Sequence, residues 1–146
     1  YQRSLRQLDP DIAVTAKACP LFVPLVENGR FRRGDVVIET VAREYLEPLR
    51  REGLDTLILG CTHYPLLTDI IGDIMGPGVT LINTGEEAAW ELKRTLRGLD
   101  LLAPEGPAGR ATLCASDQPE QFGVMASYFL GESLTRPVQP VDIDRY

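Results

Sequence analysis

Two short apolar runs, each followed by a stretch of helical periodicity, most constrain how this chain folds. The first run is LDTLILG at 54–60 and the second is VTLIN at 79–83. Runs this short and this apolar are typical of strands buried on both faces of a parallel sheet. Pro65 suits the first turn of a helix after the first run, and Thr84 and Glu87 have capping-box spacing after the second. The sequence therefore predicts an α/β fold, with a mainly parallel sheet flanked by helices.

The remaining segments extend this alternation of helices and strands. Residues 35–51 begin with Asp35, a candidate N-cap, and read as a helix. Within it, apolar side chains recur at steps of four at Val37, Val41, Tyr45 and Leu49. The other predicted elements are a helix ending at Asp9, a strand at 12–19, a loop or short helix at 20–29, a linker at 98–110, a strand at 111–116, a helix at 119–131 and a strand at 138–143.

Charge and composition argue against several classes of function. The formal net charge is −6 and basic residues form no patch, so we expect no nucleic-acid partner. No apolar stretch approaches the roughly 20 residues of a membrane span, so we expect no membrane segment. Three cysteines without close spacing, and no secretory leader, favour reduced thiols in a cytoplasmic protein. The chain opens without methionine, partway through a helical pattern, and we expect it to be cut from a longer protein.

Cys61 and His63 directly follow the first apolar run. A group at the carboxyl end of a parallel strand, in the turn that enters a helix, lies where open α/β sheets bind ligands. The positive end of the helix dipole favours a thiolate there, and His63 is a suitable proton donor or substrate ligand. A cysteine that only fills space remains an alternative, because free cysteines are usually buried. A zinc site is disfavoured because the chain offers one histidine and no closely spaced second cysteine. Cys19 and Cys114 are interpreted as small hydrophobic residues in strands, without a role.

Two longer motifs narrow these alternatives. The segments ACPLFVPLVENG at 18–29 and LILGCTHYPLL at 57–67 together resemble the glutamate racemases of the aspartate/glutamate racemase family, in order and separation. The resemblance covers nearly all of the chain. It implies a fold of two α/β lobes with the active site between them. Residues 1–83 then form most of the second lobe, with one catalytic cysteine, and residues 84–146 form a C-terminal helix, a linker and a segment that returns to the first lobe.

The resemblance also implies an activity. The family interconverts L- and D-glutamate without a cofactor and supplies D-glutamate for bacterial peptidoglycan, and so for cell wall biogenesis and cell shape. Cys61 matches the second of the family's two catalytic cysteines. His63 matches a residue that assists this cysteine and binds substrate, Thr62 matches a substrate-binding position, and Glu27 matches a carboxylate of the same polar network. No cofactor and no metal are implied.

The sequence departs from the family pattern because it lacks the motifs that form the first half of the family's active site. Neither an Asp-Ser-Gly motif nor an Ala-Cys-Asn-Thr motif occurs in the chain. We therefore expect the chain to be inactive alone, and a homodimer remains open for the full-length protein. Two alternatives also remain: a racemase for aspartate or another amino acid, and a non-catalytic α/β module that binds a small carboxylate.

Overall fold

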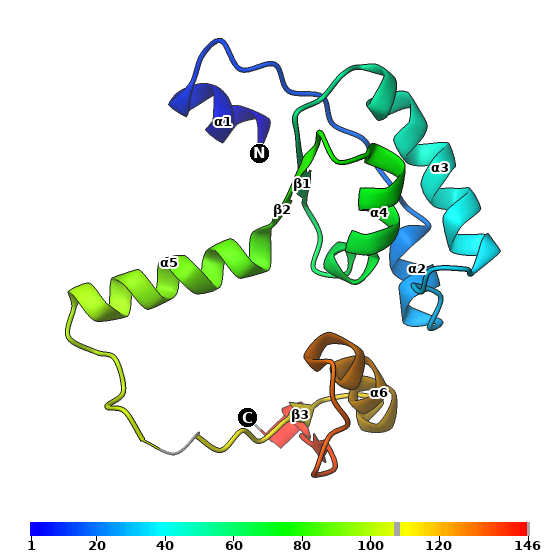
Figure 1. The fold of residues 1–146 in the computed structure, drawn as a ribbon. Coiled ribbons are helices and arrows are strands. Elements are labelled where there is room, and N and C mark those ends of the chain that lie inside the picture. The colour runs from blue at the N-terminus through cyan, green and yellow to red at the C-terminus, as the bar shows by residue number, and fades with distance from the viewer. Residues whose placement is uncertain (107–108, 146) are drawn as a thin grey trace. The chain divides into compact units, whose positions relative to one another are not determined.

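The computed structural model describes residues 1–106 and 109–145 (Figure 1). The chain divides into two compact units, Tyr1–Thr84 and Gly85–Tyr146. None of the helices in the described ranges is both long enough and apolar enough to cross a membrane. The elements are α1 (Gln2–Leu8), α2 (Phe22–Glu27), α3 (Val36–Arg51), β1 (Thr56–Leu59), the 3-10 helix η1 (Tyr64–Leu67), α4 (Thr68–Met75), β2 (Thr80–Asn83), α5 (Thr84–Gly98), β3 (Cys114–Ala115), α6 (Pro119–Leu130), β4 (Gln139–Pro140) and the 3-10 helix η2 (Ile143–Arg145).

The strand–helix–strand unit predicted around the two apolar runs is present in the first unit. Strands β1 and β2 pair in parallel, in a register that runs from Thr56 opposite Thr80 to Leu59 opposite Asn83. The connection between them is η1 followed by α4 (Figure 1). Helix α4 covers this unit with an apolar face made of Ile70, Ile71, Ile74 and Met75, all buried. The α/β class with parallel strands is confirmed.

Helix α3 forms where it was predicted, but of the four apolar residues expected along it only Leu49 is buried. Asp35 is its N-cap, and the Asp35 carboxylate accepts a hydrogen bond from the Val37 amide at 3.0 Å. Steps of exactly four residues drift around a helix of about 3.6 residues per turn by about 40° each. The buried residues instead follow spacings of four, four and three, which return to one face: Ile38, Ala42, Leu46 and Leu49. Val37 lies off this face and is 39% exposed.

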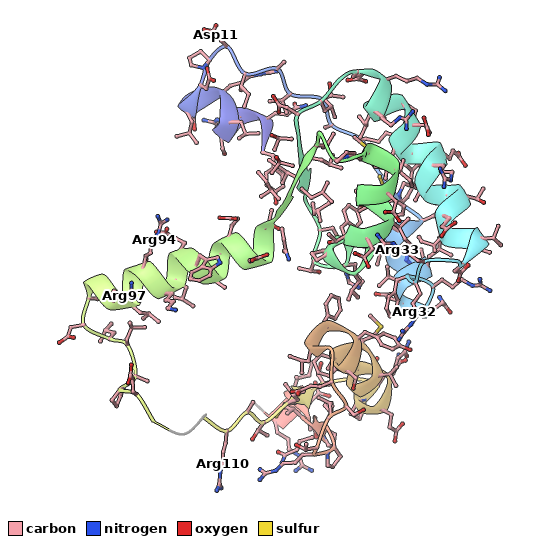
Figure 2. All side chains as sticks on the ribbon, viewed as in Figure 1. Asp11, Arg32, Arg33, Arg94, Arg97 and Arg110 are labelled. Carbon is pink, nitrogen blue, oxygen red and sulfur yellow. The ribbon has the colours of Figure 1, made fainter. Side chains whose placement is uncertain are left out.

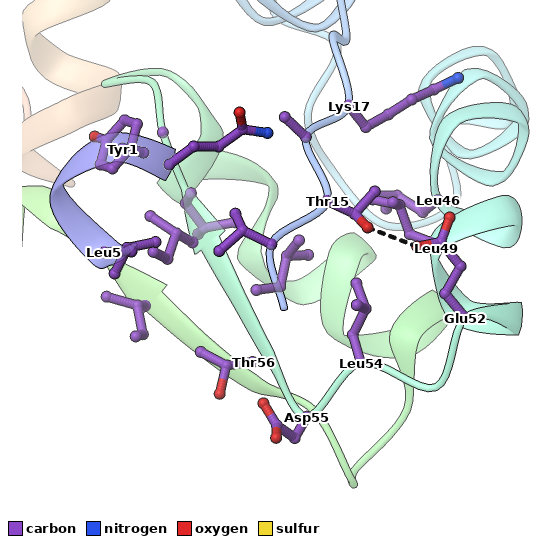
Figure 3. A pocket seen from close by; sticks show the side chains of 18 of the residues that line it. Tyr1, Leu5, Thr15, Lys17, Leu46, Leu49, Glu52, Leu54, Asp55 and Thr56 are labelled. Atoms are coloured by element: carbon purple, nitrogen blue, oxygen red, sulfur yellow. Dashed lines mark hydrogen bonds between the residues drawn. The ribbon is translucent and has the colours of Figure 1, made fainter. Parts of the chain in front are cut away.

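The predicted strand at 12–19 is not formed. Residues 12–19 have no regular secondary structure, although their composition favours a strand. This segment and β1 both line a pocket of about 760 Å³ (Figure 3), where the Thr15 hydroxyl donates to the Glu52 carboxylate at 2.9 Å. A ladder of backbone hydrogen bonds cannot form across an open space of this size, so strand propensity alone is insufficient.

The open pocket also changes the burial of β1. The prediction that this strand is buried on both faces is wrong, since only Leu59 is buried and Thr56 is exposed. The apolar side chains of Leu57 and Ile58 line the pocket and stay partly exposed. Burial on both faces would need a further layer packed over this side of the pair.

The loop after α2 is tied to α4 by Arg33 (Figure 2). Its guanidinium donates two hydrogen bonds to the Asp73 carboxylate, each at 2.8 Å, and lies 3.7 Å from Asp69. The Arg33 side chain is 57% exposed, so this bidentate pair fixes the path of the loop more than it stabilises the fold.

The second unit contains the strand, helix and strand predicted after the linker, but both strands are shorter than predicted. Strands β3 and β4 pair in parallel with Cys114 opposite Gln139. Gly131, with a φ of 68°, ends α6 in the left-handed conformation that glycine adopts at little cost. Helix α5 begins at Thr84 itself, so Thr84 is not the N-cap that the capping-box prediction required. None of the described residues of α5 or α6 is buried.

Candidate active site

Cys61 lies in a tight turn between β1 and η1, at the carboxyl end of a parallel strand as predicted. The turn is closed by backbone hydrogen bonds from the Tyr64 amide to the Cys61 carbonyl at 3.2 Å and from the Leu66 amide to the His63 carbonyl at 3.1 Å. Pro65 lies in the first turn of η1, which becomes α4 only at Thr68. The Cys61 side chain is free and partly exposed. This is a partly exposed thiol on a turn closed by two backbone hydrogen bonds.

The His63 ring has a partner at each nitrogen. Its Nε2 lies 3.3 Å from the Glu27 carboxylate, and its Nδ1 lies 3.2 Å from the Thr62 hydroxyl. A carboxylate can only accept, so the distance to Glu27 suits the tautomer with its proton on Nε2, and in that tautomer Nδ1 can accept from the Thr62 hydroxyl. The ring is 20% exposed, against 48% for Glu27. Both ring nitrogens of this imidazole, two residues along the chain from Cys61, therefore lie within reach of a polar side chain.

Glu27 reaches the turn because α2 packs beside η1. Helix α2 ends at Glu27, and its Phe22 and Val26 side chains are buried. The Phe22 ring meets Tyr64 edge-on, with centroids 5.3 Å apart, and meets Tyr45 of α3 at 5.4 Å. This aromatic cluster brings together three segments that are distant in the sequence. The sequence predicted Tyr45 only as an apolar position of the 35–51 helix, and the only signal for Phe22 and Tyr64 was their presence inside the two motifs.

Two side-chain hydroxyls connect the turn and its preceding strand to other segments of the chain. The Thr84 hydroxyl donates to the Leu59 carbonyl at 3.2 Å, and the Tyr64 hydroxyl donates to the Cys19 carbonyl at 3.4 Å. Burial is the main cause that raises the pKa of Tyr64, and the nearby thiols of Cys19 and Cys61 add to it. The phenol therefore stays protonated and remains a donor. Neither contact was predicted from the sequence.

The other cysteines occupy different environments. Cys19 is buried as predicted, although outside a strand, and burial raises the pKa of its thiol while Lys17 opposes the shift. Cys114 lies in β3 as predicted but is exposed. In the ranges that the structure describes, no three potential ligands of the types His, Cys, Asp and Glu cluster as a metal site would require.

The pocket of about 760 Å³ is adjacent to the turn but is not built around it. Gly60 and Tyr64 are among its lining residues, whereas Cys61 and His63 are not. Its walls are mainly apolar and come from 12–19, β1 and the end of α3. Because neither Cys61 nor His63 lines this pocket, the pocket alone does not account for a substrate site.

Comparisons with known proteins agree on one relationship. No protein-family model matches the chain. Glutamate racemase of Geobacter metallireducens is 42% identical over 134 residues, which are 92% of this chain and 49% of that protein. Glutamate racemase of Mycobacterium ulcerans is 46% identical over 133 residues, covering 89% of this chain and 48% of that protein. The chain is similar to about half of each of these glutamate racemases.

Solved structures give the same result for the fold. Glutamate racemase from Francisella tularensis, in complex with D-glutamate, superposes with a TM-score of 0.84 at 29% identity, covering 100% of this chain and 53% of that one. Glutamate racemase isoform RacE1 from Bacillus anthracis superposes with a TM-score of 0.84 at 35% identity, covering 98% of this chain and 52% of that one. The chain spans about half the length of the glutamate racemases that it matches. This coverage is consistent with the expectation of a C-terminal portion.

Proposed function

We propose that this chain is the portion of a glutamate racemase that carries one of two opposed acid/base groups, and that Cys61 is that group. The observation that carries the proposal is the arrangement of His63 between Glu27 and Thr62, two residues along the chain from a partly exposed cysteine that follows a parallel strand. Sequence identity of 42% to 46% to glutamate racemases supports the assignment of substrate.

Racemisation at an α-carbon requires two groups on opposite faces of the substrate. One group removes the α-proton, which leaves a carbanion, and the other delivers a proton from the opposite face, so that the configuration inverts. In our proposal the Cys61 thiolate removes the proton of L-glutamate and becomes a thiol, and in the reverse direction the thiol returns it. The group on the other face is not assigned to any residue of this chain.

His63 and its two partners support the thiol in this proposal. An imidazole held by Glu27 can accept the thiol proton, because the carboxylate stabilises the imidazolium that forms. The Thr62 hydroxyl can turn toward a substrate carboxylate when it releases Nδ1. Cys61, His63 and Glu27 are thus the proposed catalytic residues, and Thr62 and His63 the proposed substrate ligands.

The wider role follows from the same relationship. We propose that the complete protein uses no cofactor, acts in the cytoplasm and supplies D-glutamate for peptidoglycan. Glutamate is then its small-molecule substrate. A homodimer of the complete protein is part of this proposal.

The test compares two cysteine variants of the complete gene product. Circular dichroism follows the racemisation of L-glutamate and, separately, of L-aspartate. Cys61→Ala should lower the glutamate rate by more than about 100-fold, because one of two opposed bases is lost. Cys114→Ala, a matched change at an exposed cysteine of the second unit, should leave the rate unchanged. A Cys61→Ala rate within tenfold of the unaltered protein would exclude the role given to Cys61, and faster turnover of aspartate would exclude glutamate as the preferred substrate.

A further inference from the structure

We propose that the hydroxyls of Thr84 and Tyr64 are positioning groups that hold the Cys61-bearing turn from both ends. Tyr64 lies inside the motif at 57–67 and Thr84 directly follows the second apolar run, yet neither has a place in the proposed acid/base chemistry. The inference deepens the proposed function because it concerns the geometry of the same site, but its test does not depend on racemisation.

Thr84 fixes the point where the chain leaves β1. Leu59 is the last residue of β1 and pairs with Asn83, the last residue of β2. Thr84 therefore follows at the level where the turn begins, and its hydroxyl donates to the Leu59 carbonyl at 3.2 Å. The Leu59 side chain is only 2% exposed, so the residue at this end of the turn is anchored in the packed core. Gly60 and Cys61 therefore follow a residue whose carbonyl group is held in place by Thr84.

Tyr64 fixes the point where the turn enters η1. Its hydroxyl donates to the Cys19 carbonyl at 3.4 Å, and its ring packs edge-on against Phe22, at an interplanar angle of 87°. Phe22 is 1% exposed and opens α2, the helix that ends at Glu27. Tyr64 therefore ties the turn to the same helix that carries the carboxylate partner of His63.

The two contacts explain how a partly exposed pair keeps its geometry. The Glu27 side chain is 48% exposed, and ion pairs at exposed sites are weak because water competes for both groups. Such a pair alone would not hold the His63 ring in one position. Anchoring Leu59 on one side and Tyr64 on the other restricts the few residues between them, so that Cys61 and His63 need little further ordering before they act.

The experiment measures local opening of the turn in the full chain of 146 residues. Amide hydrogen exchange is followed by NMR at Tyr64, whose amide closes the turn on the Cys61 carbonyl, and at Ile74 inside α4 as the reference. Thr84→Val removes the hydroxyl but keeps the shape, and Thr84→Ser keeps the hydroxyl. Tyr64→Phe is the corresponding change at the other end.

Loss of either hydroxyl should accelerate exchange at the Tyr64 amide by roughly three- to tenfold, the usual effect of removing one neutral hydrogen bond. Exchange at Ile74 should stay unchanged, and Thr84→Ser should behave like the unaltered chain. Cys61 should also be alkylated faster by a similar factor, whereas the buried Cys19 should not.

Three outcomes would overturn the inference. Unchanged exchange at the Tyr64 amide in both Thr84→Val and Tyr64→Phe would show that neither hydroxyl holds the turn. Equal acceleration at Tyr64 and Ile74 would show a general loss of stability, and failure of Thr84→Ser to restore slow exchange would show that the hydroxyl is not the cause. Local opening as expected, together with a Cys61→Ala protein that still racemises glutamate, would instead reject only the proposed function.

Discussion

At the residue scale, the candidate site depends on a contact between positions 36 residues apart in the sequence, Glu27 and His63. Glu27 by itself reads as a solvated charge, and only its motif linked it to the cysteine turn. The structure gives the physical basis of the link, because the carboxylate lies 3.3 Å from the imidazole. If the pair orients His63, removing the charge should reduce activity without unfolding the protein.

Glu27→Gln tests this directly in the complete gene product. The amide keeps the size of the side chain but cannot stabilise an imidazolium, so we expect the rate of glutamate racemisation to fall on the order of 100-fold. Glu44→Gln, at an exposed position of α3, is the matched control and should have no effect. Kinetic assays with circular dichroism measure both. A rate for Glu27→Gln equal to that of the control would remove Glu27 from the catalytic network.

The environment of Cys19 gives a second prediction at this scale. Burial raises the pKa of its thiol, so at pH 8 a smaller share is thiolate than for an exposed cysteine. We expect brief iodoacetamide treatment, followed by peptide mapping, to label Cys19 on the order of tenfold more slowly than Cys114. The native thiol binds its proton more tightly than the unfolded one, so the associated stability is present below the usual thiol pKa and is lost as the pH rises through the raised value. Equal labelling of the two cysteines in folded protein would contradict this prediction.

At the element scale, the sequence predicted which segments form helices and strands better than it predicted which faces of those segments are buried. The parallel pair β1–β2 and helix α3 formed where periodicity and capping placed them, because those signals are local. The burial of β1 and the state of residues 12–19 depend on whether another segment covers or pairs with them, and local sequence holds no information on that partner. The cysteine turn was found because its position follows from the order of a strand and a helix, whereas the Thr84 and Tyr64 contacts required the tertiary structure.

The buried face of α3 can be tested by substituting two neighbouring residues, one buried and one exposed. Ile38 is 0% exposed and Val37 is 39% exposed. Ile38→Ala should lower the free energy of unfolding by about 2–5 kcal/mol, because it removes a buried side chain and leaves a cavity. Val37→Ala should cost less than about 1 kcal/mol, as expected for a surface change. Urea unfolding followed by far-ultraviolet circular dichroism measures both, and similar losses for the two variants would contradict the observed face.

At the scale of the whole molecule, the described residues of the second unit include several exposed large apolar side chains. Trp90 of α5 is 57% exposed, and Phe122 and Phe129 of α6 are each 43% exposed. Helix α5 is amphipathic, yet none of its residues is buried. Apolar surface of this kind usually marks a site of contact with another protein surface. The matched racemases are about twice as long as this chain, so the part of them outside the match is long enough to supply such a surface.

We therefore predict that the chain, purified alone, self-associates and does not racemise glutamate. Light scattering after size exclusion should show a mass that rises with concentration, and circular dichroism should show no loss of L-glutamate over many hours. Refolding with the remainder of the gene product should suppress association and restore racemisation, because both the apolar face and the second acid/base group are then supplied. The same mixture made with the Cys61→Ala chain should be monodisperse but inactive, which separates assembly from catalysis. Racemisation by the chain alone would show that both acid/base groups lie within these 146 residues, and the two-half interpretation would then be wrong.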